Sequence, residues 1–171
     1  MADRRKQAAL QARRWANLGR LLGFASGLFN YRVIETVRTL GFSDLRQSHS
    51  HLMRSMQLEG SRITALADRA AITKQAMSGI VAEMEELGYV TTTVDPADGR
   101  AKLVTYTEAG RQLVDAVVQS AERVEGEYNR VLGERRAKQF RRSLEMLFEA
   151  LTPDHVADDA GWVDKGRRSE G

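Results

Sequence analysis

The sequence predicts a mainly α-helical protein with a single small β-hairpin. Two observations support this fold class. Apolar residues recur at helical spacing through most of the chain, from residue 10 to residue 151. Between residues 61 and 107 this period changes after Gly88, where strand-forming residues flank the turn sequence DPADGR. Two short helices followed by such a hairpin predict a winged helix-turn-helix lobe within one domain of residues 1–171.

The first long helix is expected over residues 10–40, after a polar and frayed start. Its apolar stripe ends at Leu40, and Gly41 terminates it. Three glycines lie four residues apart within it, at Gly19, Gly23 and Gly27. This spacing fits either close packing against another helix or a local kink, and we favour close packing at a dimer contact.

A linking helix is expected over residues 43–59, starting at Ser43 or Asp44 and closing at Gly60. His49 lies on its apolar face, one turn from Leu45. Such a histidine is either a core residue bonded within the fold or a group that grips a ligand, because an imidazole can bond a carboxylate or a phenol.

The lobe over residues 61–107 contains the most informative local signals. Thr64 is the expected N-cap of its first helix, and Thr73 that of its second. The second helix carries an apolar stripe made of Ala76, Ile80, Met84 and Leu87, widened by Met77 and Val81. Thr107 then caps a long helix, Gly126 weakens that helix, and Gly133 separates it from a last helix that ends at Leu151. Residues 108–151 are expected to form the C-terminal dimerisation helices, together with the N-terminal helix, and 152–171 a disordered tail.

The exposed start of the second helix of the lobe has side chains suited to a DNA groove. Lysine can bond guanine, glutamine can pair with adenine, and threonine or serine can bond bases or phosphate. An arginine on the hairpin can reach the minor groove. The predicted DNA-contacting residues are Thr73, Lys74, Gln75, Ser78, Arg100 and Lys102, with Asp98 positioning the hairpin.

These residues also carry a family resemblance. The stretch ITALADRAAITKQAMSGIVAEMEELGYV followed by DPADGRAKLVTYTEAG resembles the multiple antibiotic resistance regulator (MarR) family of bacterial transcription factors. Asp98, Arg100 and the sequence from Thr107 to Gly110 match its hairpin pattern. The resemblance implies a homodimer that binds a pseudopalindromic DNA operator as a repressor, and a small, aromatic or anionic ligand that releases it.

The resemblance also implies a ligand pocket between the dimerisation helices and the lobe. Arg38, Arg46, His49 and His51 are the polar candidates for binding a ligand there. A regulator that binds DNA without any effector is the alternative that differs only in this pocket.

One rival belongs to another class of function. Gly79 stands where the family often has a basic residue, and Glu83, Glu85 and Glu86 follow it. These residues would suit a winged helix that docks a partner protein instead of DNA. The basic N-terminus, which includes Arg4, Arg5 and Lys6, is either a solvated segment or an arm that contacts DNA.

Composition limits the other classes. The net charge of +3 is mild, and 42% hydrophobic content is ordinary for a globular domain. The chain has no cysteine, which excludes a disulfide or a thiol switch. No catalytic motif or cofactor motif is recognisable. A metal site is not expected either, because His49 and His51 are two residues apart and lie on different faces of the expected helix. The apolar run LLGFASGLF is too short to span a bilayer, so we expect no membrane partner and a cytoplasmic, nucleoid-associated protein.

Overall fold

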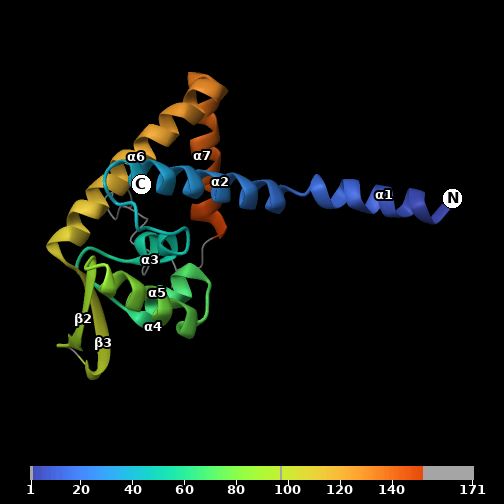
Figure 1. Cartoon of the computed structure of the whole chain (residues 1–171). Helices are drawn as coiled ribbons and strands as arrows, with labels where there is room; N and C mark the ends of the chain where they lie inside the picture. The colour runs from blue at the N-terminus through green and yellow to red at the C-terminus, as the bar shows by residue number, and fades with distance from the viewer. Residues whose placement is uncertain (1, 97, 152–171) are drawn as a thin grey trace, which may run out of the picture.

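A computed structural model describes residues 2–96 and 98–151 of the chain. The elements follow the predicted order of helices, hairpin and helices (Figure 1). They are α1 (Ala2–Trp15), α2 (Leu18–Thr39), α3 (His49–Ser55), β1 (Ser61–Arg62), α4 (Ile63–Ala70), α5 (Lys74–Glu86), β2 (Val90–Asp95), β3 (Asp98–Tyr106), α6 (Glu108–Leu132) and α7 (Glu134–Leu151). The mainly helical fold class with a small sheet is therefore confirmed.

The lobe from α3 to β3 is a winged helix-turn-helix. Its sheet has the strand order β1-β3-β2 and is antiparallel throughout. Strand β1 pairs Ser61 with Val104 and Arg62 with Leu103. The sequence predicts the hairpin β2–β3 but not β1, because two residues are too few to show a strand period.

The hydrophobic core lies inside this lobe and beneath the helices that join it. It is formed by the C-terminal part of α2, by α3 to α5, by the sheet and by α6 as far as Val124. Its fully buried members include Val37, Leu45, Leu52, Leu66, Met77, Met84, Val104 and Leu113. Burial of these side chains provides the main driving force that holds α5 and the hairpin in place.

The helix predicted over residues 10–40 is two helices, and the expectation of a frayed start is wrong because α1 begins at Ala2. The break falls at Asn17, whose side chain accepts the backbone N–H of Arg20 and so caps α2. The Arg20 guanidinium lies 4.0 Å from the Trp15 ring centroid and 5.4 Å from that of Phe24. Figure 1 shows α1 extending away from the rest of the molecule.

Helix α2 runs unbroken through all three glycines. A Cβ atom added at Gly23 or Gly27 would meet nothing within 4 Å. Close packing at this stripe therefore does not occur within the single chain. Packing of the stripe against a second chain stays a prediction.

The linking helix is much shorter than predicted. Only residues 49–55 are helical, and Ser48, not Ser43 or Asp44, is the N-cap residue. Turns occupy the preceding segment because Arg38 and His49 hydrogen-bond its backbone at Leu45 and Arg46. The expected Thr64 cap is also wrong: α4 starts at Ile63, directly after β1, so its N-cap is Arg62.

The C-terminal boundaries agree with the predicted ones. The Thr107 hydroxyl accepts the Gly110 N–H and caps α6, and Gly133, at φ 75°, ends it. The helix continues through Gly126 without a break. The predicted disordered tail, residues 152–171, lies outside the described residues.

Helices α1, α2 and α7 present a large apolar surface to solvent. None of the residues of α7 is buried. The large apolar side chains exposed on these helices are Leu10, Trp15, Leu18, Leu21, Leu22, Phe24, Leu28, Tyr31, Phe140, Leu144, Met146, Leu147 and Leu151. A surface of this kind is typical of a protein interface.

Candidate nucleic-acid interface

The N-terminal turn of α5 is exposed and capped as predicted. The Thr73 side chain accepts the Ala76 N–H at 3.1 Å, which satisfies one of the free donors of the first turn. Lys74 and Gln75 are exposed beside it. The Ser78 hydroxyl donates to the Lys74 carbonyl at 2.8 Å, so its oxygen stays available only as an acceptor. The structure thus brings the four predicted residues together at the N-terminal end of α5.

The buried face of α5 matches the predicted stripe except at Ala76. Met77, Ile80, Val81 and Met84 are buried, whereas Ala76 is exposed. Ala76 therefore belongs to the exposed face of α5, next to Gly79.

The hairpin β2–β3 forms the wing beside α5. Its ladder is regular from Val90 to Val94 and shifts register between Val94 and Asp95. The Asp98 carboxylate accepts the Arg100 N–H at 3.1 Å, which is the side-chain-to-backbone bond expected of a positioning residue in a turn. Arg100 and Lys102 are both exposed on β3.

Arg62, which the sequence does not single out, joins the wing to the lobe. Arg62 Nε lies 2.6 Å from Asp95 Oδ2, and its Nη1 lies 3.8 Å from Asp98 Oδ2. Asp95 is buried, so its charge needs such a partner. The only available signal was Arg62 itself, because the pairing of β1 with β3 is not visible in the sequence.

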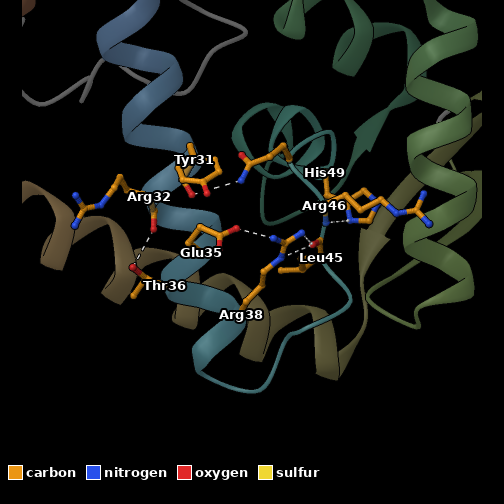
Figure 2. Close-up of polar contacts among 9 residues, drawn as sticks. Tyr31, Arg32, Glu35, Thr36, Arg38, Leu45, Arg46 and His49 are labelled. Atoms are coloured by element: carbon orange, nitrogen blue, oxygen red, sulfur yellow. Dashed lines mark hydrogen bonds and ion pairs between the residues drawn. The ribbon is translucent and has the colours of Figure 1, made fainter.

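Arg38, one of the ligand candidates, hydrogen-bonds the backbone of the segment between α2 and α3. The Arg38 guanidinium donates to the Leu45 carbonyl from Nε at 2.8 Å and from Nη2 at 2.5 Å. Its Nη1 also contacts Glu35 at 2.5 Å. Figure 2 shows Arg38 pointing from α2 into this segment, with Arg46 and His49 beyond Leu45.

His49 is 1% exposed, and both of its ring nitrogens are engaged. Nδ1 accepts the Arg46 N–H at 3.2 Å, which leaves Nε2 to donate to Glu83 Oε2 at 3.0 Å. Arg46 Nη1 contacts the same Glu83 oxygen at 3.1 Å. The hydrogen bond from His49 lowers the pKa of Glu83, burial opposes this shift, and the Arg46 charge adds to it.

His51 differs from the other candidates. Its Nδ1 atom is buried and has no hydrogen-bond partner within the described part of the chain. Burial, and next the nearby Arg54 charge, lower the pKa of His51. The structure therefore groups Arg38, Arg46 and His49, while His51 lies in the same region but outside their contacts.

An apolar groove of about 580 Å³ lies elsewhere, between α2, α6 and α7. Its walls include Leu22, Phe29, Tyr128, Phe140 and Leu144. None of the four ligand candidates lines it. The groove coincides with part of the apolar surface of the outer helices.

Residues 2–96 and 98–151 contain no membrane-spanning helix and no cluster of metal ligands. No helix there combines the length and the apolar character needed to cross a bilayer. In the same residues, no three histidine, cysteine, aspartate or glutamate side chains are grouped so that they could hold a metal ion.

The fold and the exposed turn of α5 beside the wing define a winged helix-turn-helix protein. A profile of the MarR family matches residues 44–101, which contain this lobe. The transcriptional activatory protein BadR from Rhodopseudomonas palustris is 28% identical over 108 residues, which is 63% of this chain and 61% of BadR. The chain thus spans less than two thirds of that relative.

Solved structures agree with the family match. The chain resembles CouR from Rhodococcus jostii RHA1, crystallised with p-coumaroyl-CoA, at 28% identity and a TM-score of 0.62, covering 81% of this chain and 94% of CouR. A MarR-family regulator from Rhodococcus sp. RHA1 is 29% identical, with a TM-score of 0.55 and coverage of 80% and 98%. The profile match over residues 44–101 and these likenesses together support a winged-helix transcriptional regulator of the MarR type.

Proposed function

We propose that the protein is a homodimeric, sequence-specific DNA-binding regulator. The observation that carries this proposal is the exposed, capped N-terminal turn of α5, with Lys74 and Gln75 free beside the wing. In this arrangement α5 enters a major groove and Arg100 reaches the adjacent minor groove. Such a role would place the protein on the nucleoid, in the cytoplasm.

The apolar surface of α1, α2 and α7 supports a dimer. A single chain leaves this surface in water, and a second copy would remove it. A two-fold dimer places two copies of α5 in successive major grooves, so the operator would have two half-sites. The helices over residues 10–40 and 108–151 keep their proposed role as the dimerisation region.

We further propose that a small aromatic or anionic ligand releases the repressor from its operator. Support comes from CouR, whose crystal structure contains an aromatic acyl-CoA. Arg38, Arg46, His49 and His51 remain the proposed contacts. Since the first three already bond within the chain, an anion would have to compete with the Glu35 and Glu83 carboxylates.

The ligand proposal is tested by adding p-coumarate or p-coumaroyl-CoA to a DNA-binding titration. A ligand that prefers the DNA-free form weakens operator binding, and Arg38→Ala reduces that response. No effect of either compound, or an unchanged response in the variant, would contradict the proposed ligand class or site. The relative BadR is named as an activatory protein, so a reporter gene under the operator decides the sign of regulation.

DNA binding itself is tested with the fragment upstream of the coding region at two salt concentrations. We expect saturable binding that weakens with salt, because cationic side chains displace counterions from phosphates. Arg100→Ala reduces affinity and lowers the salt slope of the dimer by about two, or one for each wing. Arg135→Ala, which removes an exposed charge from α7, serves as the matched control and leaves both unchanged.

The rival function, protein docking through the lobe, predicts the opposite pattern. A complex with a partner protein would form without DNA and would be insensitive to salt. Glu83 gives this rival little support, because in the folded chain it contacts His49 and Arg46. Glu85 and Glu86 remain exposed on α5.

A further inference from the structure

Hydrogen bonds and the peptide link between Leu45 and Arg46 connect α2 to α5. Arg38 of α2 holds the Leu45 carbonyl, and the next residue, Arg46, donates its N–H to His49. His49 then contacts Glu83 on the third turn of α5. The path joins an outer helix to the helix proposed to read DNA.

The centre of this path is rigid and buried. The backbone N–H of His49 donates to the Arg46 carbonyl at 3.1 Å, while the Arg46 N–H donates back to the His49 ring. These reciprocal bonds resemble a capping box and leave the ring few orientations. With 1% of His49 exposed, Glu83 is held by a ring that is itself fixed.

Glu83 lies too far along α5 to contact DNA from the proposed reading turn. Glu83 lies nine positions after Lys74, which corresponds to about 14 Å along a helix axis. This separation exceeds the Debye length of about 8 Å at physiological salt, so repulsion between Glu83 and phosphates near Lys74 is largely screened. Its contacts point inward, to α3 and the preceding turn.

We infer that His49 and Glu83 form a coupling joint that sets the orientation of α5 relative to α2 and α3. They are positioning residues: they determine DNA affinity without touching DNA. This inference rests on the proposed DNA-binding function. Through Arg38, movement of α2 changes the strain at the joint and hence the position of the reading turn.

The joint and simple electrostatics predict different results for one substitution. Glu83→Ala removes a negative charge from a DNA-binding helix, which by charge alone would leave binding equal or slightly tighter, since screening removes most of the repulsion. If Glu83 positions α5, the same substitution weakens binding, by about 3- to 30-fold for coupling of typical strength. Alanine is a good helix former, so the helix itself is retained.

The experiment compares DNA affinity of Glu83→Ala with that of Glu86→Ala, which removes an equal charge from an exposed position on α5. Glu83→Gln, which keeps an oxygen for the His49 Nε2–H, is expected to restore most of the affinity. Urea titrations establish that each variant is folded. If Glu83→Ala is not folded, Glu83→Met, of similar length without an acceptor, replaces it.

Weaker binding by Glu83→Ala with rescue by glutamine supports the joint. Equal or tighter binding, as in Glu86→Ala, overturns it. Arg100→Ala separates this result from failure of the proposed function, because it weakens any genuine DNA complex. If the wild type binds no DNA, amide hydrogen exchange of α5 tests the joint instead. Faster exchange in Glu83→Ala but not in Glu86→Ala supports positioning by Glu83, and unchanged exchange in Glu83→Ala overturns it.

Discussion

Gly110 lies where the backbone of α6 passes close to the lobe. A Cβ atom at this position would stand 1.9 Å from the Tyr89 carbonyl oxygen. The same carbonyl accepts the Thr107 N–H at 3.1 Å, so the backbone there cannot easily move. This contact gives a physical reason for glycine in the sequence Thr107 to Gly110, which carries part of the family resemblance.

We therefore expect Gly110→Ala to lower the free energy of unfolding by about 2 to 3 kcal/mol, as overpacking does. Gly126→Ala, in the same helix, is the control because its added Cβ meets nothing within 4 Å. It should raise stability by about 0.5 to 1 kcal/mol. Urea unfolding of both variants measures the difference, and equal effects would contradict the close approach at Gly110.

Tyr106 gives the fold an alkaline limit. Burial raises the pKa of Tyr106 to about 12, whereas a free tyrosine ionises near 10. The unfolded chain therefore loses this proton first as pH rises, so stability is intact below pH 10 and falls between about 10 and 12. The loss from this residue amounts to about 2 to 3 kcal/mol. Urea midpoints across this range should fall less steeply in Tyr106→Phe, and parallel curves would refute the assignment.

At the scale of elements, α5 depends on its cap. The Thr73 side chain bonds the Ala76 N–H, and replacement by alanine leaves that donor without a protein partner. Thr73→Ala should destabilise the protein by about 1 kcal/mol, and Thr73→Ser should not, because it keeps the hydroxyl. Thermal or urea unfolding without DNA measures this. A serine variant as unstable as the alanine variant would argue against the cap.

Elements were predictable where a local signal decides them. Thr73, Thr107, Gly88 and Gly133 mark helix ends through their own side chains or backbone freedom, and the structure has them there. The segment before α3 has helical periodicity but is mostly turns. Its backbone is bonded instead by Arg38 from α2 and by the His49 ring, and no sequence window contains such a distant competitor.

The candidate site divides in the same way. Lys74, Gln75 and Ser78 follow from one capped helix, so they could be grouped from sequence. Arg62 could not, because its role comes from Asp95, which lies 33 residues away across the sheet. In the sequence Glu83 suggests part of an acidic docking surface, whereas in the fold it contacts His49.

At the scale of the whole molecule, the uncovered outer helices require a second copy in our proposal. Leu144→Glu places a charge on a wall of the groove between α2, α6 and α7, and should shift the protein toward monomer. Val94→Glu, at an exposed apolar position on the wing, should not. Sedimentation velocity at several concentrations measures the oligomeric state. A wild-type monomer at all concentrations would contradict the proposed dimerisation region.

The central claim is that two copies of α5 read DNA together. Hydroxyl-radical footprinting on the fragment upstream of the coding region tests this most directly. We predict two protected patches centred about 34 Å, or one helical turn, apart on a short inverted repeat. These patches should weaken together in Arg100→Ala. Uniform cleavage at protein concentrations that saturate binding, or no binding above that to random DNA, would contradict the claim.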